Sequence, residues 1–194
     1  MKSATVITGT GLPLRRSDVD TDQIIPAEWL KRVERTGFEQ GLFATWRDDR
    51  DFVLNDERYS GATMIVAGPA FGVGSSREHA VWAIQQYGFD AVIAPSFSDI
   101  FRNNCTKNGL VPVEQPMESV TRIWDAIDAD PTVEITIDME RLLVEIPAIG
   151  YEEPFPMEAQ NQYRFLNGLD DVGITLSHGD EIASFEAARP AWMR

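Results

Sequence analysis

Hydrophobic positions in the middle of the chain form short runs separated by helical patterns. Residues 63–67 and 91–95 are apolar runs of strand length, and residues from about 77 to 87 between them have helical spacing. Gly88 stands where a left-handed residue would end that helix. Short apolar runs bounded by turn residues are typical of buried strands. Two of them joined by a helix predict a right-handed βαβ unit.

The alternation of helix and strand continues toward the C-terminus. A shorter helix is expected from Ser98 to about Asn104, and residues 110–113 form a third apolar run. Apolar residues then recur at helical spacing within 117–129, which predicts an amphipathic helix. The stripe that should face the core consists of Val120, Ile123, Trp124 and Ile127.

The remaining patterns are shorter. Residues 133–138 alternate with period two and residues 142–146 return, so a hairpin is expected. Residues 4–8 indicate a short strand, and residues 41–62 are polar and loop-rich with a few aromatic anchors. Two late helices, at roughly 158–167 and 179–188, close the chain. We expect His178, just before the second of these helices, to cap it or to be solvated.

A glycine-rich stretch, residues 72–78, separates the strand at 63–67 from the helix that follows. Its two glycines allow backbone conformations closed to other residues and a close approach to a ligand. The helix N-terminus offers unpaired N–H groups and the positive end of a dipole, which suit an anion. Ser75 and Ser76 add hydroxyls, and Arg77 adds a planar fork that fits a carboxylate. The stretch therefore indicates an anion site.

A purely structural interpretation of the same stretch stays open, because Ser75-x-x-Glu78 also fits a capping box. Two nucleotide and hydrolase motifs are absent: no Gly-Lys-Ser/Thr follows the glycines, and Gly-x-Ser-x-Gly does not occur. Two histidines far apart in sequence give little support to a Ser-His-Asp triad. His79 could support the site, although packing is the simpler role.

Three alternating aspartates, Asp18, Asp20 and Asp22, resemble the opening of a calcium loop. The glycine and the distal glutamate of such a loop are missing. We expect instead that Asp20, Thr21 and Asp22 bond to nearby backbone N–H groups and fix a turn.

Residues 28–38 carry three cations within five positions, Lys31, Arg32 and Arg35. A solvated helical face would explain them. A mobile flap that brings positive charge to a substrate would explain them equally well.

Composition narrows the range of partners. The chain has 194 residues, of which 43% are hydrophobic and 25% charged, as expected for one globular domain. The net charge of −14 argues against nucleic acid or an anionic membrane as partner, so local arginines must attract any anion. A single cysteine, Cys105, provides neither a disulfide framework nor a set of thiolate ligands, and points to a reducing cytoplasm. No apolar run has the length of a signal peptide or membrane span.

Several of these segments resemble one family. Residues 71–80, Phe-Gly-Val-Gly-Ser-Ser-Arg-Glu-His-Ala, resemble the swivelling-domain signature of the aconitase superfamily. Further segments resemble the family of small subunits of bacterial 3-isopropylmalate dehydratase: residues 19–26, 35–38, 87–89, 94–101 and 168–176. The resemblance implies an α/β fold, a three-layer β/β/α swivelling domain as in the aconitase C-terminal domain. It would span residues 1–194 as one domain, with a substrate-recognition flap at about 28–38 and a helical extension at about 155–194.

The resemblance also implies a function. Members of this family are hydro-lyases of leucine biosynthesis that interconvert 2-isopropylmalate and 3-isopropylmalate by dehydration and rehydration, and they act only with a large subunit. A [4Fe–4S] cluster is held by that large subunit, and this chain would bind no metal, in agreement with its single cysteine. The implied arrangement is a cytoplasmic heterodimer acting on a small dicarboxylate.

The resemblance assigns roles to residues of this chain. Ser75 would take and return the proton next to a carboxylate, Ser76 would support it by hydrogen bonding, and Arg77 would clamp a substrate carboxylate. The further substrate contacts would be Gly74, Thr36 and one of Arg32 and Arg35, and which arginine contacts substrate stays open. Support of the site falls to Asp20, Thr21, Asp22 and His79.

Three other functions remain compatible with the sequence. A hydro-lyase for citraconate or a methylmalate-type dicarboxylate would share the serine motif. A non-catalytic scaffold subunit would not need Ser75 for activity. A free anion-binding module would bind isopropylmalate without a partner.

Overall fold

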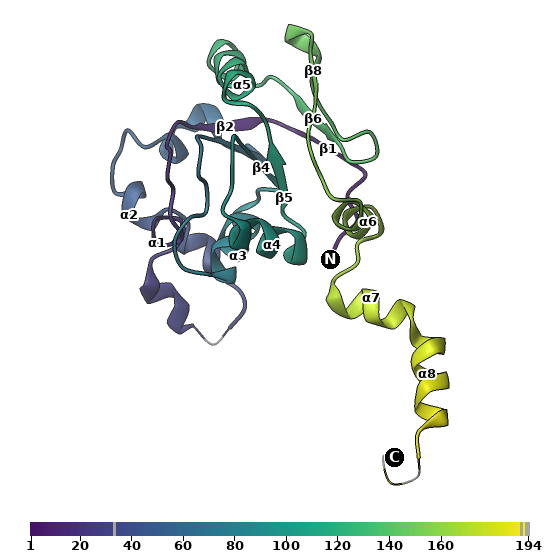
Figure 1. The fold of residues 1–194 in the computed structure, drawn as a ribbon. Coiled ribbons are helices and arrows are strands. Elements are labelled where there is room, and N and C mark those ends of the chain that lie inside the picture. Colours follow the sequence, from purple (N-terminus) through teal and green to yellow (C-terminus); the bar gives the residue numbers. More distant parts are fainter. Residues whose placement is uncertain (33, 191, 193–194) are drawn as a thin grey trace.

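The computed structural model describes residues 1–32, 34–190 and 192. Two four-stranded sheets and the helices packed on them form the body, and a pair of C-terminal helices extends away from it (Figure 1). One sheet is parallel, with the order β2-β3-β4-β5. Its strands are β2 (Gly11–Leu14), β3 (Met64–Ala67), β4 (Ala91–Ala94) and β5 (Val111–Glu114).

Every residue of β2, β3 and β4 is buried, as expected for a parallel sheet that is covered on both faces. Helix α3 (Glu78–Tyr87) joins β3 to β4, and α4 (Asp99–Asn108) joins β4 to β5. Helix α5 (Met117–Ala129) packs across β2, β3 and β4. Trp124 of its apolar stripe donates through Nε1 to the carbonyl oxygen of Val66 at 2.9 Å.

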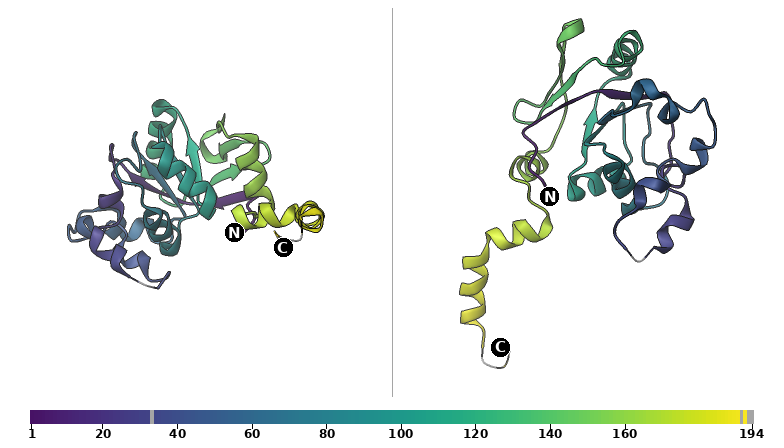
Figure 2. Two further views of the ribbon diagram at one scale, coloured as in Figure 1. Left: turned by 60° about the horizontal axis from the view of Figure 1, so that its bottom comes forward. Right: turned by 180° about the vertical axis from the view of Figure 1, so that it is seen from behind.

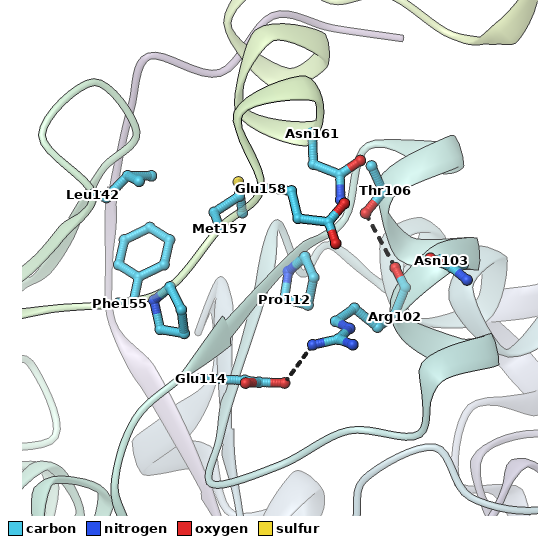
Figure 3. Close-up of a pocket in the computed structure, with 11 residues that line it drawn as sticks. Arg102, Asn103, Thr106, Pro112, Glu114, Leu142, Phe155, Met157, Glu158 and Asn161 are labelled. Atoms are coloured by element: carbon cyan, nitrogen blue, oxygen red, sulfur yellow. Dashed lines mark hydrogen bonds and ion pairs between the residues drawn. The ribbon is translucent and has the colours of Figure 1, made fainter.

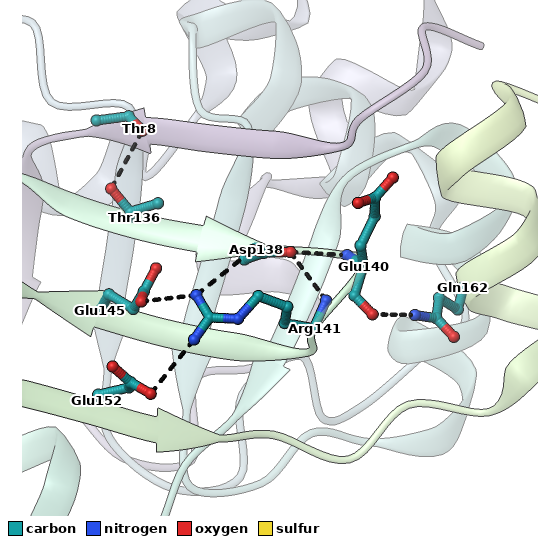
Figure 4. A network of polar contacts seen from close by, with 8 residues as sticks. All are labelled: Thr8, Thr136, Asp138, Glu140, Arg141, Glu145, Glu152 and Gln162. Carbon is teal, nitrogen blue, oxygen red and sulfur yellow. Dashed lines mark hydrogen bonds and ion pairs between the residues drawn. The ribbon is translucent and has the colours of Figure 1, made fainter.

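The second sheet is antiparallel, with the order β1-β6-β7-β8. Only alternate residues of β6 are buried, because one face packs on the core and the other is solvated. On the solvated face, Arg141 donates to Glu145 at 2.9 Å and to Glu152 at 3.3 Å (Figure 4). The strands are β1 (Val6–Gly9), β6 (Ile135–Asp138), β7 (Leu143–Ile146) and β8 (Tyr151–Pro154).

Short helices fill the connections of the body. Two are α-helical, α1 (Thr21–Ile24) and α2 (Ala44–Arg47). The 3₁₀ turns are η1 (Ala27–Lys31), η2 (Phe38–Gly41), η3 (Val53–Asn55), η4 (Glu57–Tyr59) and η5 (Pro147–Ile149).

The C-terminal part consists of α6 (Ala159–Asn167), α7 (Asp171–Ser177) and α8 (Gly179–Ala188). The two views of Figure 2 show α7 and α8 standing clear of both sheets. Residues at the N-terminus lie beside α6, where the Ala4 N–H donates to the carbonyl oxygen of Phe165 at 2.9 Å. Within the described ranges, no helix is long and apolar enough to cross a bilayer.

The structure confirms the predicted βαβ unit, the helix at 117–129 and the hairpin. Apart from the short helices in the connections, the elements that were not predicted are β2, β8 and α7. Strand β2 contains Pro13, which an edge strand tolerates because one side needs no ladder donor. The helix predicted to end near Asn104 continues to Asn108, where Gly109 in a left-handed conformation ends it.

Candidate active site

The turn between β3 and α3 is held between two other loops. On one side, the Gly72 N–H donates to the carbonyl oxygen of Val19 at 2.8 Å. On the other, Ser98 donates through Oγ to the carbonyl oxygen of Gly72 at 2.5 Å. These bonds join three segments that are far apart in sequence, and together they fix the backbone just ahead of Ser75.

Both glycines of the turn are required by its geometry. Gly72 has φ +76° and Gly74 has φ +91°, in the left-handed region that glycine adopts without strain. A Cβ on Gly72 would also collide with the ring of Phe101. The two glycines therefore occupy positions where the backbone is in the left-handed conformation.

The two serines are exposed at the surface of the turn. Thr21, only 2% exposed, donates through Oγ1 to the carbonyl oxygen of Ser75 at 2.8 Å. In the part of the chain that the structure describes, neither serine hydroxyl has a hydrogen-bond partner. The backbone of Ser75 is thus fixed, while its hydroxyl remains free to meet a ligand.

Arg77 is the charged group of the turn, and its side chain is only 14% exposed. Its Nη1 donates to Asp22 Oδ1 and to the carbonyl oxygen of Ile25, the latter at 3.3 Å. The other two guanidinium nitrogens, Nε and Nη2, have no protein partner within the described residues. Neither is among the buried atoms that lack a partner, so both are accessible. Two donors of the guanidinium therefore remain available.

The capping-box interpretation of Ser75 and Glu78 is wrong. The N-cap of α3 is Arg77, whose side chain caps nothing, and Glu78 instead accepts a hydrogen bond from Asn108 at 2.9 Å. A capping box does form at α1, where the Gln23 N–H donates to Asp20 Oδ1 and Gln23 Oε1 accepts from the Asp20 N–H. The two serines consequently do not cap the N-terminus of α3.

The residues of the acidic segment, 18–22, make different contacts. Asp20 caps α1 as expected, whereas Thr21 and Asp22 bond to the serine turn rather than to nearby N–H groups. Across the described ranges, no group of three histidine, cysteine or carboxylate side chains is arranged to hold a metal ion. The side chains of Asp20 and Asp22 are therefore engaged in structural contacts.

His79 packs in an aromatic cluster. Its ring lies 5.3 Å from that of Phe38 and 4.7 Å from that of Trp82, both in edge contacts measured between centroids. This is the packing role expected from the sequence.

The end of the predicted flap, at Arg35 and Phe38, lies against α3. Gln86 of that helix accepts from the Phe38 N–H at 2.9 Å and donates to the carbonyl oxygen of Arg35 at 2.9 Å. Arg35 extends over the ring of Trp82, 5.7 Å from its centroid. The sequence did not single out Gln86 or Trp82, and nothing in the local pattern distinguishes them. Val33 lies outside the described residues.

The second flap arginine has a different environment. Arg32 lies over Trp29, 4.5 Å from its ring centroid, and donates to the carbonyl oxygen of Gly37 at 3.2 Å. Both contacts are within the flap itself. Thr36, on the same segment, is exposed.

A cavity of about 500 Å³ lies away from the serine turn, between α4, β5 and the start of α6 (Figure 3). Arg102 within it is already paired with Glu114 at 3.0 Å and with Asp99 at 2.9 Å. None of the predicted site residues lines this cavity. The candidate site is instead the open surface around Ser75, which a second surface would have to close.

Cys105 is fully buried in α4, and burial raises the pKa of its thiol well above the usual range. An iron–sulfur cluster needs several accessible thiolates. The residues of this chain do not fit such a cluster.

Two family models match parts of this chain. Residues 1–118 match the family model of the aconitase C-terminal domain, and residues 171–194 match that of the C-terminal domain of the 3-isopropylmalate dehydratase small subunit. The α/β swivelling fold expected from the sequence is thereby confirmed.

Individual relatives cover the whole chain. The 3-isopropylmalate dehydratase small subunit of Frankia alni is 55% identical, covering 100% of this chain and 98% of the relative. That of Rubrobacter xylanophilus is also 55% identical over the same shares. The crystal structure of a 3-isopropylmalate dehydratase from Methanocaldococcus jannaschii superposes with a TM-score of 0.65 at 28% identity, covering 93% of this chain and 99% of the other.

Proposed function

This chain belongs to the aconitase-family small subunits of 3-isopropylmalate dehydratase, and on that premise we propose that Ser75, Ser76 and Arg77 are its share of the active site. The enzyme is a hydro-lyase of leucine biosynthesis. In the reaction that we propose, 2-isopropylmalate and 3-isopropylmalate interconvert through loss and return of water. The observation that carries the assignment is an exposed serine pair on a fixed backbone beside an arginine with two unused donors.

Ser75 acts as the base. It takes the proton from the carbon next to a substrate carboxylate and returns it when water adds back. A serine hydroxyl is a weak base, so nearby donors must stabilise the alkoxide and the charge that develops on the substrate. The hydroxyl of Ser76 and the N–H groups of the turn are suitable donors, since no protein acceptor uses the N–H groups of Gly74, Ser75 or Ser76 among the described residues.

Arg77 binds a substrate carboxylate. Its Nη1 is engaged by Asp22 and Ile25, which leaves Nε and Nη2. These two nitrogens present the parallel N–H pair that matches the two oxygens of a carboxylate. Asp22 thus orients the guanidinium without occupying the edge that meets the substrate.

Of the two flap arginines, we assign Arg35 to the substrate. Arg35 lies over α3, the helix that the serine turn opens, whereas Arg32 contacts only residues of the flap. Thr36 adds a hydroxyl on the same segment.

The site is completed by a large subunit. The serine turn is open to solvent, and the chain has one cysteine, which is buried. We therefore assign the [4Fe–4S] cluster and its chemistry to the large subunit. This chain supplies the proton acceptor and the carboxylate-binding arginine.

The test is anaerobic reconstitution with a cluster-bearing large subunit, following the absorbance of the unsaturated intermediate formed from 3-isopropylmalate. Ser75→Ala should lower kcat by about 10³-fold or more, because the base is lost. Ser60→Ala, at an exposed turn serine outside the β3–α3 turn, serves as the matched control and should keep wild-type activity.

Each other result identifies an alternative. If Ser75→Ala retains activity, the base lies elsewhere and this subunit is a scaffold. If the wild-type pair turns over citraconate but not isopropylmalate, the mechanism stands and the substrate is a methylmalate-type acid.

A further inference from the structure

The last two helices, with the described residues 189, 190 and 192 after them, form an arm that makes no use of the hydrophobic core. Within the described part of the arm, residues 171–190 and 192, no residue is buried. Several large apolar side chains on it are well exposed: Val172 by 65%, Leu176 by 71%, Phe185 by 65% and Trp192 by 77%. Large exposed apolar side chains gathered on one short segment mark an interaction surface.

The apolar residues have helical spacing. Val172 and Leu176 are four residues apart on α7, and Ile182 and Phe185 are three apart on α8, so each pair shares one face of its helix. This is the arrangement with which a helix enters a hydrophobic groove of another protein.

The arm helices are too short to be stable alone. They have 7 and 10 residues, and isolated helices below about 12–15 residues are marginal in water. Local bonds such as that from Ser184 Oγ to the carbonyl oxygen of Asp180 add little. A surface that covers the apolar faces would supply the missing stabilisation.

The body fixes the root of the arm. Arg164 of α6 pairs with Asp171 at 2.6 Å, and the Gly173 N–H donates to Asp170 at 2.7 Å. Gly168, just before the root, packs so closely on residues 1–3 that a side chain there would clash. The arm therefore leaves the body in a defined direction.

Charge argues against a second copy of this chain as the occupant. The whole chain carries −14, so two copies repel each other. The arm itself is acidic, with Arg189 as its one Lys or Arg between positions 171 and 192 against four carboxylates. Those carboxylates are Asp171, Asp180, Glu181 and Glu186. The complementary surface is an apolar groove with a basic rim.

We propose that the arm, residues 171–192, is a principal docking element for the large subunit, with Leu176 and Phe185 as its apolar anchors. This inference rests on the proposed function, which supplies the large subunit. The aconitase-domain match, which contains the serine turn, ends at residue 118, whereas the arm matches a model specific to small subunits of this enzyme. A segment characteristic of separate small subunits, and outside the shared catalytic part, is suited to holding the partner.

The test measures binding of the full-length chain to the full-length, cluster-loaded large subunit by biolayer interferometry. The variant Leu176→Glu/Phe185→Glu should weaken binding on the order of 100-fold, because two anchors are replaced by charges. Met117→Glu is the matched control: the same kind of change at a residue 41% exposed, in the first turn of α5 on the far side of the body from the arm (Figure 1). It should change the Kd by less than about twofold.

Two further readouts test whether the variant is folded and whether charge contributes to docking. The thermal unfolding midpoint of the isolated double variant should equal that of wild type, since these side chains contact none of the core. Raising NaCl from about 50 to 500 mM should weaken wild-type binding, because salt screens the acidic arm from a basic rim.

The outcomes distinguish this proposal from the proposed function. If the double variant binds like wild type, docking by the arm is wrong even though the wild-type pair turns over isopropylmalate. If wild-type binding depends on the arm but the pair does not turn over isopropylmalate, the arm proposal stands and the substrate assignment fails. If the wild-type chain self-associates and the double variant does not, the arm is an interface between copies and the proposal is overturned.

Discussion

Arg77 and Asp22 form an ion pair across 55 residues of sequence. The arginine lies at the start of α3 and is largely buried, whereas the aspartate lies on α1 and is 57% exposed. The pair ties the acidic segment to the serine turn and holds one nitrogen of the guanidinium in place. The position of the Arg77 guanidinium thus depends on a residue that the sequence presents as part of a separate motif.

Asp22→Asn should lower kcat/KM for isopropylmalate about 10- to 100-fold, because Arg77 loses the charge that orients it and small misplacements are costly. Most of the loss should appear in KM if Arg77 mainly binds the substrate carboxylate. The control is Asp125→Asn, at an exposed aspartate on α5, which should leave both constants unchanged. Unaltered kinetics in Asp22→Asn would show that the pair is not needed to orient Arg77.

Gly72→Ala should destabilise the chain by about 2–4 kcal/mol, since it adds left-handed strain to a collision with Phe101. Gly61→Ala measures the cost of the left-handed backbone strain alone. Gly61 has φ +87° and open space around a built Cβ, so only the strain of about 1–2 kcal/mol should appear. Urea unfolding of both variants measures the difference, and equal losses would mean that the Phe101 contact relaxes freely.

Cys105 should not react with a thiol reagent in the native chain. Burial raises its pKa well above the usual range, and the reactive form is the thiolate. With Ellman's reagent at about pH 8, close to the ordinary thiol pKa, we expect no reaction in buffer and one thiol per chain in denaturant. Rapid native labelling would mean that α4 opens locally.

Tyr151 should make stability fall at alkaline pH. Its hydroxyl donates to Gln115 at 2.8 Å, and burial raises its pKa above 10.0, the ordinary value that the unfolded chain regains. The folded chain therefore holds this proton more tightly. Its contribution is complete below the unfolded pKa of about 10 and is lost as pH rises through the folded pKa.

Tyr151→Phe tests this linkage. The variant should be about 1 kcal/mol less stable at neutral pH, because a hydrogen bond is lost, and its stability should fall less steeply than that of wild type above about pH 10. Urea midpoints across this pH range give both slopes. Parallel slopes would assign the alkaline loss to other groups.

Most of the fold could be predicted from the sequence, because its signals are local. The apolar runs at β3 and β4 and the stripe on α5 identify those elements without any knowledge of tertiary contacts. Strands β2 and β8 escaped prediction because four residues that include a proline or two glutamates carry no clear alternation. Helix α7 escaped because its seven residues are too few for a periodic stripe.

The serine turn was also predictable, whereas its supports were only partly so. The glycine positions and the residues of the turn follow from backbone chemistry that is written locally. The capping-box alternative fitted the same residues equally well. The structure excludes it, because Glu78 accepts a hydrogen bond from Asn108 instead. Spacing alone cannot say which of two acceptors a side chain will reach.

The sequence by itself determined most of the strands, the longer helices and the chemistry that the turn can offer, since periodicity and turn propensity act over a few residues. The tertiary structure alone decided that Asp22 meets Arg77, that Thr21 fixes Ser75 and that Gln86 ties the flap to α3. These contacts join segments about 50 residues apart, which the folded chain brings together. The sequence could not predict these contacts because they depend on how distant segments pack together, which no local pattern encodes.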